Sequence, residues 1–235
     1  MVIGALAGVL WSVAVRGADP SFIDVCWGAG FVVVAAVSYA LSPERPLLVV
    51  LAAVWGLRLA TYLYWRWRRT GPDPRYKRIS ATRAFGLQTP LLLLVSLPLQ
   101  LGQVYDERLS ALNVIGALLT LFGIAFETTA DAQLMRFKAD AANAGQVMDR
   151  GLWRYTRHPN YFGDFCVWWG LFLVSVSNAV TVIGIVGPIV MSFLLMRYSG
   201  VGPLERQLNR TNPQYAEYTT RTSAFFPSRP KPLSR

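Results

Sequence analysis

The stretch Phe31-Val-Val-Val-Ala-Ala-Val-Ser-Tyr-Ala40 decides the fold class of this sequence. It contains no charged residue, and its polar residues do not alternate with apolar ones. A strand of a membrane β-barrel alternates with a period of two, whereas a helix surrounded by lipid is apolar on every side. We therefore predict an all-α fold built from membrane-spanning helices.

The composition of the whole chain agrees with this prediction. Of the 235 residues, 53% are hydrophobic and only 15% are charged, whereas about 25% is usual for the charged residues of a soluble domain. This profile excludes a disordered chain and an ordinary soluble domain. The two cysteines lie in apolar runs and the chain has one histidine, so we expect neither a disulfide framework nor a metal cluster.

Seven apolar segments are candidates to cross a hydrocarbon core of about 30 Å. The first has no basic region before it and no small-residue cleavage site after it, so we expect a retained helix and not a signal peptide. The seven segments are Met1–Val15, Phe22–Leu41, Pro46–Trp67, Leu87–Gln103, Leu109–Thr129, Tyr161–Val176 and Val180–Tyr198.

The basic residues predict the orientation of this bundle. The net charge is +10, and 19 of the 23 Lys and Arg residues lie after the third segment, after the fifth segment and in the tail from Arg197 onward. Seven crossings put these regions on one side, which the positive-inside rule makes cytoplasmic, with the N-terminus outside. This distribution points to a membrane and not to a nucleic-acid partner. We expect one domain over residues 1–235, with cytoplasmic loops 68–86 and 131–160 and a cytoplasmic tail 199–235.

The most unusual block is Gly151-Leu-Trp-Arg-Tyr-Thr-Arg-His-Pro-Asn-Tyr-Phe-Gly-Asp164. Pro159 suits the first turn of a helix, which would carry Asn160 and Asp164 on one face, with Tyr155, Arg157 and His158 just before it. Free amides at a helix N-terminus and basic side chains both favour an anion. The alternative is a cluster at the membrane interface, where aromatic residues mark the headgroup level.

A second group of polar residues ends the fifth segment. Glu127 and Asp131 are one helical turn apart, and Lys138 lies on a similar face. A carboxylate at membrane depth costs about 2.5–3.5 kcal/mol, so it usually faces a polar cavity. The alternative is a helix that simply emerges into water.

Charged residues also lie inside the second and third segments. Asp24 stands near Trp27, and Arg58 is followed at four-residue intervals by Tyr62 and Arg66. Asp24 and Arg58 either form a structural ion pair or line a substrate cavity between helices. The basic loop 71–78 could hold a phosphate group or touch lipid headgroups, and Tyr215 and Tyr218 of the tail could stack on a base or pack beneath the helices.

These residues together carry a family resemblance. The chain resembles the membrane steroid 5α-reductase family, and most closely its bacterial branch labelled DUF1295. The resemblance includes Asp24-Val-Cys-Trp-Gly, Asp73-Pro-Arg-Tyr, Ala130-Asp-Ala-Gln-Leu, the block from Gly151 and Thr222-Ser-Ala-Phe-Phe-Pro. The Arg-His-Pro-Asn-Tyr-Phe-Gly motif is shared with sterol C14-reductases and isoprenylcysteine carboxyl methyltransferases.

The resemblance implies a seven-helix protein of the bacterial inner membrane that binds NADPH from the cytoplasm and reduces an activated C=C bond in a lipid or steroid-like substrate. Asp24 would be the catalytic carboxylate, with Arg58 or Tyr62 as substitutes; the tyrosine of the steroid reductases falls on Trp55 here. We expect Asp131, Asn160 and Asp164 to point into one polar well open to the cell interior. The implied cofactor-binding residues are Arg66, Arg69, Asp131, Lys138, Tyr155, Arg157, His158, Asn160, Asp164, Glu205 and Tyr218.

Two other functions stay open from the sequence. The shared His158-Pro159 motif is compatible with a methyltransferase that uses S-adenosylmethionine on a lipid-linked substrate, although Asn160 and the segment Ala130–Gln133 favour the reductase. A lipid-binding protein without catalysis is the third possibility. The glycine-rich fingerprint of soluble dinucleotide-binding domains is absent, since Gly28 and Gly30 lie inside an apolar segment.

Overall fold

The computed structural model describes residues 22–71, 81–104, 109–198 and 201–231. The predicted all-α class is confirmed: the described residues form helices, with one isolated bridge between Thr156 and Ser223. The first predicted segment, Met1–Val15, and most of the basic loop 71–78 lie outside the described residues. The α-helices are α2 (Ile23–Leu41), α3 (Pro46–Thr70), α4 (Ala81–Val95), α5 (Leu97–Leu101), α6 (Ala111–Ala139), α7 (Pro159–Ser175), α8 (Val186–Phe193), α9 (Val201–Thr211) and α10 (Pro213–Arg221).

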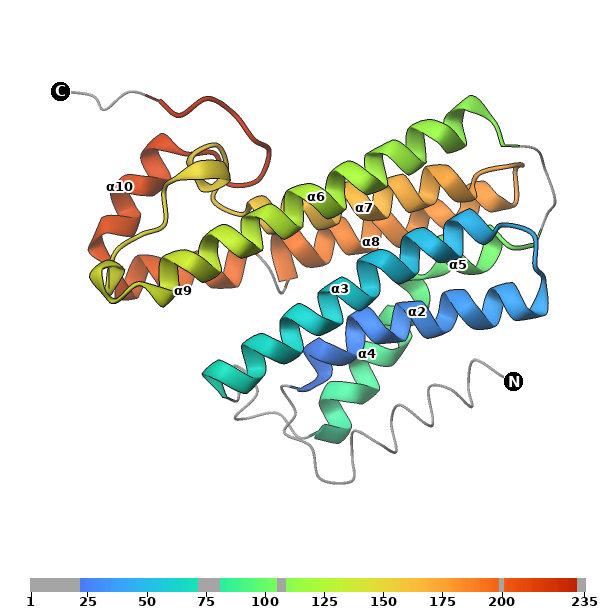
Figure 1. Cartoon of the computed structure of the whole chain (residues 1–235), viewed down its shortest axis with the longest axis horizontal. Helices are drawn as coiled ribbons and strands as arrows, with labels where there is room; N and C mark the ends of the chain where they lie inside the picture. The colour runs from blue at the N-terminus through green and yellow to red at the C-terminus, as the bar shows by residue number, and fades with distance from the viewer. Residues whose placement is uncertain (1–21, 72–80, 105–108, 199–200, 232–235) are drawn as a thin grey trace. The chain divides into compact units, whose positions relative to one another are not determined.

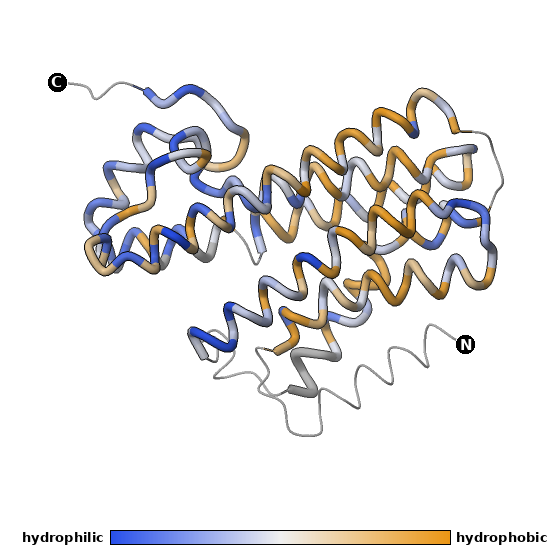
Figure 2. Tube along the Cα trace, in the orientation of Figure 1, coloured by the Kyte–Doolittle hydropathy of each residue, from blue (hydrophilic) through white to orange (hydrophobic). Residues whose placement is uncertain are grey.

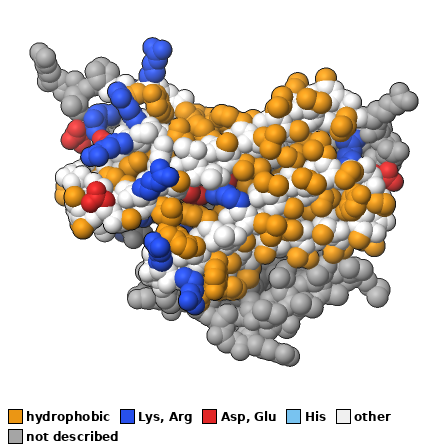
Figure 3. Space-filling model, in the orientation of Figure 1, with side chains coloured by type: hydrophobic (Ala, Val, Ile, Leu, Met, Phe, Trp, Pro, Cys, Tyr) orange, Lys and Arg blue, Asp and Glu red, His pale blue; other side chains and the backbone are white. Residues whose placement is uncertain are grey.

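Four helical stretches are long and apolar enough to cross a membrane. Hydrophobic side chains dominate the face drawn in Figure 3, and on α6 Leu118 is 62% exposed and Leu121 51% exposed. Exposed leucines on one face of a long helix are typical of a surface in contact with lipid. The chain is thus an integral membrane protein. The four stretches are Ile23–Leu41, Pro46–Thr70, Ala111–Ala139 and Thr181–Tyr198.

Two predicted segments have other boundaries in the structure. The segment Leu87–Gln103 is divided into α4 and α5 at Ser96, whose hydroxyl donates to the carbonyl of Leu93 at 3.0 Å. Pro98 follows directly and has no amide proton to continue the helical ladder. In contrast, α6 extends ten residues beyond the predicted end at Thr129, so that Asp131 and Lys138 stand on one continuous helix.

The chain divides into two compact units, and each is described by itself. Unit 1 contains residues 1–117 and 171–187, and unit 2 contains residues 118–170 and 188–235. In unit 1, α2 packs on α3 where two glycines meet, because a Cβ on Gly28 would overlap the backbone at Gly56 and Ala60. Phe31 and Trp55 pack beside this contact, with ring centroids 5.7 Å apart.

Buried polar side chains hold the helix ends of unit 1. The Asn113 side chain is 1% exposed and donates to the carbonyls of Leu173, Val174 and Val176 at 2.9–3.1 Å. Arg45 donates from Nη1 to the Val174 carbonyl at 2.8 Å. These bonds satisfy carbonyls at the end of α7 that have no partner within the helix.

Unit 2 joins the apolar half of α6 and α7 to a polar end. Gly163 of α7 lets the two helices approach, because a Cβ there would lie 2.6 Å from the amide nitrogen of Glu127 on α6. Beyond this contact, α9, α10 and the segment that follows α6 gather at the C-terminal end of α6 (Figure 1). Hydropathy changes along the same direction, from orange on α6 and α7 to blue and white on α9 and α10 (Figure 2).

The C-terminal tail of unit 2 is fixed to the start of α7. The Thr156 hydroxyl, which is fully buried, donates to the carbonyl of Phe225 at 2.8 Å. The rings of Phe225 and Phe226 pack edge-on against Phe162 and Phe165, with centroids 5.6–6.2 Å apart. This anchoring brings α9 and α10 against the Gly151–Asp164 block, where the site lies.

Candidate ligand-binding site

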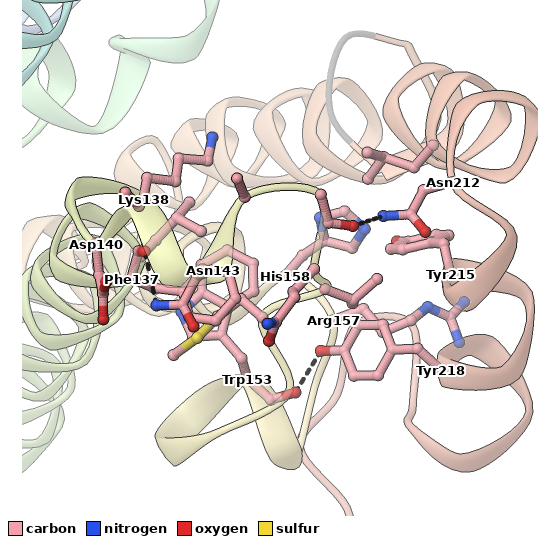
Figure 4. A pocket seen from close by; sticks show the side chains of 18 residues that line it. Phe137, Lys138, Asp140, Asn143, Trp153, Arg157, His158, Asn212, Tyr215 and Tyr218 are labelled. Carbon is pink, nitrogen blue, oxygen red and sulfur yellow. Dashed lines mark hydrogen bonds between the residues drawn. The ribbon is translucent and has the colours of Figure 1, made fainter.

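Unit 2 contains a partly open cavity of about 400 Å³ at the C-terminal end of α6 (Figure 4). This volume is within the range of about 300–1,000 Å³ that is usual for small-molecule sites. Its walls come from the end of α6, the segment 140–148, the residues before α7, and α9 with α10. The lining residues are Leu134, Phe137, Lys138, Asp140, Ala141, Asn143, Ala144, Gly145, Gln146, Val147, Met148, Trp153, Arg157, His158, Leu208, Asn212, Tyr215 and Tyr218.

The segment 140–148 forms one wall because short-range hydrogen bonds fold it back over α6. The Asp140 carboxylate accepts from the amide of Ala142 at 2.9 Å and begins a short 3₁₀ turn. The Asn143 side chain donates to the carbonyl of Phe137 at 3.0 Å. Gly145 then adopts φ +76°, a left-handed conformation that favours glycine, and its carbonyl accepts from the Asn212 side chain at 2.9 Å.

Aromatic side chains form another part of the wall. The Trp153 indole is 8% exposed and donates to the carbonyl of Ala130 on α6 at 3.1 Å. The Tyr218 hydroxyl donates to the carbonyl of Trp153, and the rings of Tyr215 and Tyr218 meet edge-on at 5.7 Å. In Figure 4 the dashed line from Tyr218 to Trp153 joins α10 to the residues that precede α7. Flat apolar faces with a few polar groups are typical of a site for an aromatic ligand.

An ion-pair network lies between α9 and the residues that precede α7. Arg157 donates from Nε and Nη2 to the two carboxylate oxygens of Glu205, at 2.7 and 3.1 Å. Its Nη1 donates to the carbonyls of Thr219 and Thr222. His158 is 2% exposed, and its Nε2 lies 3.2 Å from Glu205 Oε1. Arg157 thereby fixes both α9 and the end of α10 to the wall of the cavity.

The network controls the ionisation of Glu205. Burial alone would raise the pKa of this carboxyl group, but the hydrogen bonds from His158 and Arg157 and the charge of Arg157 outweigh burial and lower the pKa to about 2. Glu205 is therefore ionised at neutral pH. Burial raises the pKa of Tyr215 and of Tyr218 above the ordinary value for tyrosine, so both hydroxyls stay protonated.

A second buried polar pair joins α6 to α7. The Asn160 side chain donates to Asp131 Oδ1 at 3.3 Å, and Asp131 is 4% exposed. Asn160 Oδ1 is buried without a hydrogen-bond partner. Asp164 lies one turn further along α7 and is partly buried. The sequence predicted one polar well for these three residues; the structure brings Asp131 and Asn160 together, and none of the three is among the lining residues of the cavity.

The structure gathers most of the predicted cofactor-binding residues in unit 2. Four of them line the cavity, namely Lys138, Arg157, His158 and Tyr218. Glu205 contacts two of these four but lines no part of the cavity itself. Tyr155 is 44% exposed and lies outside it.

The remaining predicted residues belong to unit 1. Arg66 and Arg69 are exposed at the end of α3, where the Arg69 guanidinium lies 3.9 Å from the centre of the Trp65 ring. Asp24, Arg58 and Tyr62 are all partly buried, on α2 and α3. The antiparallel contacts Phe22–Trp67 and Phe31–Trp55 place Asp24 at the level of Tyr62 and within about two turns of Arg58. The catalytic role of Asp24, Arg58 and Tyr62 stays a prediction.

Several lining residues were not predicted from the sequence. Tyr215 was expected either to stack on a base or to pack beneath the helices, and Trp153 belongs to the Gly151–Asp164 block, but nothing in the sequence shows that the two face one cavity. Asn143 and Asn212 were not predicted. The signal available for Asn212 is its position before Pro213, which marks the N-cap of α10, and its side chain also accepts from the amide of Gln214.

The arrangement defines a class of protein. It is an all-helical integral membrane protein with a ligand-sized, partly open cavity that is lined by aromatic side chains, one lysine and one histidine. In the described part of the chain, no group of three or more His, Cys, Asp or Glu side chains is arranged to hold a metal ion.

Comparison with known proteins then gives the family. Residues 10–222 match the family described as "Protein of unknown function (DUF1295)", so the chain belongs to the DUF1295 family. No curated protein and no solved structure matches the chain.

Proposed function

We propose that this protein is an NADPH-dependent membrane reductase that acts on an activated C=C bond of a steroid-like or other lipid. One observation carries the proposal: the partly open cavity of unit 2 combines aromatic side chains with Lys138 and His158 at the end of a membrane-length helix. A dinucleotide has flat rings, which aromatic side chains can contact, and negatively charged phosphates, which a lysine can bind. Both kinds of side chain line this cavity. The resemblance to the steroid 5α-reductase family supports the choice of reaction.

The residues present fit such a cofactor by their chemistry. Lys138 lines the cavity, and its ammonium group would neutralise the negative charge of a phosphate. Trp153, Tyr215 and Tyr218 would contact a base or nicotinamide ring, while Asn143 and Gln146 offer amide groups to its polar edge. The Asp131–Asn160 pair joins α6 to α7 outside the lining of this cavity, so in our proposal it supports the site without contacting the ligand.

The chemistry that NADPH supplies when bound is a hydride, delivered to the β-carbon of an enone, after which NADP⁺ remains. The electron pair of the C=C bond then forms an enolate, whose α-carbon takes a proton to complete the reduction. A donor directed at the carbonyl oxygen stabilises the developing negative charge. In our proposal Asp24 supplies this donor, with Arg58 or Tyr62 as substitutes, and the proton comes from the same group or from water.

The proposal includes a topology. We infer seven membrane crossings in the bacterial inner membrane, with the N-terminus outside and the C-terminus in the cytoplasm, as the positive-inside rule indicates for this sequence. This orientation would open the polar end of unit 2 to the cytoplasm, where NADPH is available. It also presents the apolar helices to a lipid substrate.

One observation favours a second function. The cavity volume of about 400 Å³ is at the lower end of the usual range for ligand pockets. Such a volume suits a mononucleoside cofactor such as S-adenosylmethionine better than a dinucleotide. A lipid methyltransferase is therefore the alternative.

A ligand titration separates the two functions. A ligand that binds only the native state raises the thermal unfolding temperature, so purified protein is titrated with NADPH, NADP⁺ and S-adenosylmethionine. We expect stabilisation by NADPH and NADP⁺ only. Stabilisation by S-adenosylmethionine alone would favour the methyltransferase, and the absence of any response would leave a lipid-binding protein without a cofactor.

A further inference from the structure

His158 is the only histidine of the chain and is nearly inaccessible to solvent. It lines the cavity from the residue just before α7. Its ring stacks on Tyr161 with an interplanar angle of 3° and a centroid distance of 5.4 Å. Burial and stacking fix the plane of the ring. The tautomer of the neutral ring, that is, which of the two ring nitrogens carries the proton, then depends on the groups that contact these nitrogens.

Glu205 determines the tautomer of His158. Both carboxylate oxygens accept from Arg157, and a guanidinium stays charged at every physiological pH. An ionised carboxylate only accepts hydrogen bonds. The contact of 3.2 Å between Glu205 Oε1 and His158 Nε2 therefore requires the proton on Nε2. While the ring is neutral, Nδ1 then has a lone pair.

We propose that Glu205 is a positioning residue, which holds His158 in the Nε2–H tautomer so that Nδ1 accepts a hydrogen bond from the ligand in the cavity. The ligand part of this inference rests on the proposed function of the cavity. Glu205 acts through His158 and does not line the cavity itself. This role differs from the direct cofactor contact that the resemblance implies for Glu205.

The inference specifies the chemistry of the ligand group that His158 recognises. A neutral ring with a free Nδ1 lone pair selects an N–H or O–H donor, such as a carboxamide or a sugar hydroxyl. It does not select a phosphate oxygen, which offers only lone pairs. His158 and Lys138 would therefore recognise different parts of one ligand, a donor group and an anionic group respectively.

The charged and titratable groups near His158 come from each neighbouring element. They are Glu205 of α9, Arg157 before α7, Tyr161 of α7, Tyr215 and Tyr218 of α10, and Lys138 with Asp140 at the end of α6. Among these, Glu205 is the group with a hydrogen bond to the ring.

The single histidine makes the test direct. Protein labelled with ¹⁵N in histidine gives one imidazole spectrum, in which a protonated and a bare ring nitrogen have distinct shifts. At a pH where the ring is neutral, we expect a protonated Nε2 and a bare Nδ1 in the free wild type. Glu205→Gln removes the anionic acceptor, and we expect its spectrum to move toward a mixture of tautomers. Glu217→Gln makes the same change on an exposed side chain of α10 and should leave the spectrum unchanged.

NADPH is the probe for the ligand part. We expect NADPH to shift the Nδ1 signal of the wild type and to bind Glu205→Gln about tenfold more weakly. A protonated Nδ1 in the free wild type, or a Glu205→Gln spectrum equal to that of wild type, would overturn the positioning role. Binding of NADPH with no change at Nδ1 would overturn the acceptor role. If NADPH fails to bind the wild type, the proposed function fails, and the spectra of the free proteins still decide the role of Glu205.

Discussion

Both units bury polar side chains, but they use them in different ways. In unit 1, Asn113 and Arg45 bind backbone carbonyls at a helix end, and their hydrogen bonds hold the helices in place. In unit 2, Arg157 and His158 bind Glu205 beside a cavity, and Arg157 also donates to the carbonyls of Thr219 and Thr222. Buried polar groups need hydrogen-bond partners: those of unit 1 find them in the backbone of a helix end, whereas those of unit 2 form a side-chain network at the wall of a cavity.

This comparison predicts the largest stability loss in unit 1. Asn113→Ala removes the side-chain hydrogen bonds to the carbonyls of Leu173, Val174 and Val176 and the two that Asn113 Oδ1 accepts from Ser110. We expect the free energy of unfolding to fall by about 3 kcal/mol, measured by denaturant unfolding in detergent. NADPH affinity of the folded fraction should stay unchanged. The exposed Asn209→Ala is the control, and an equal loss there would contradict the comparison.

The next effect depends on pH and belongs to unit 2. The pKa of Glu205 is lowered from 4.5 to about 2, so its ion pair stabilises the fold above about pH 4.5, and this contribution is lost as the pH falls toward 2. Glu205→Gln should lower the free energy of unfolding by roughly 2 kcal/mol at pH 7. The gap between wild type and variant should close with falling pH. A gap that is constant from pH 7 to pH 3 would show that the ion pair contributes nothing.

A third substitution should change binding and spare stability. Lys138→Gln removes a positive charge from the cavity wall, and we expect NADPH affinity to fall about tenfold, or about 1.4 kcal/mol. The thermal unfolding temperature without ligand should hardly move. Isothermal titration calorimetry measures the affinity, and Lys138→Arg, which keeps the charge, should recover most of it. Equal binding by Lys138→Gln and wild type would exclude a phosphate contact.

The smallest predicted effect concerns the aromatic wall. Tyr218→Phe keeps the ring but removes the hydrogen bond to the carbonyl of Trp153. We expect a stability loss of about 1 kcal/mol and a few-fold weaker binding of NADPH, because the Trp153 wall loses one of its two anchors. Unfolding curves in denaturant measure the stability loss, and calorimetry measures the binding of NADPH. A variant with wild-type stability would show that this hydrogen bond contributes nothing to the free energy of unfolding.

The sequence predicted the helical class and the membrane character because both depend on composition along short windows. Pro159 correctly marked the start of α7, since proline suits a first helical turn. The division between α4 and α5 at Ser96 was missed, because a long apolar run hides a local break. The number of membrane crossings and their orientation stay predictions.

The candidate site was predictable only in part. Arg157 and His158 stand in the unusual Gly151–Asp164 block, whereas the family resemblance alone pointed to Glu205 and Tyr218. In the structure Glu205 contacts Arg157 and His158, and Tyr218 lines the cavity beside them; their role as cofactor-binding residues stays a prediction. The walls made by Asn143 and Asn212 were not predicted, because they depend on a left-handed turn at Gly145 and on a hydrogen bond between segments far apart in sequence. Tertiary contacts of this kind leave no periodic pattern.

The central claim is that the cavity of unit 2 binds NADPH, and filling the cavity tests it most directly. Ala144 lines the cavity, whereas Ala142 lies on the same exposed segment and does not. Equilibrium titration of NADPH against wild type, Ala144→Trp and Ala142→Trp is the measurement. The account predicts that wild type and Ala142→Trp bind alike and that Ala144→Trp, still folded, does not bind. Equal binding by Ala144→Trp and Ala142→Trp, or no binding by the wild type, would contradict it.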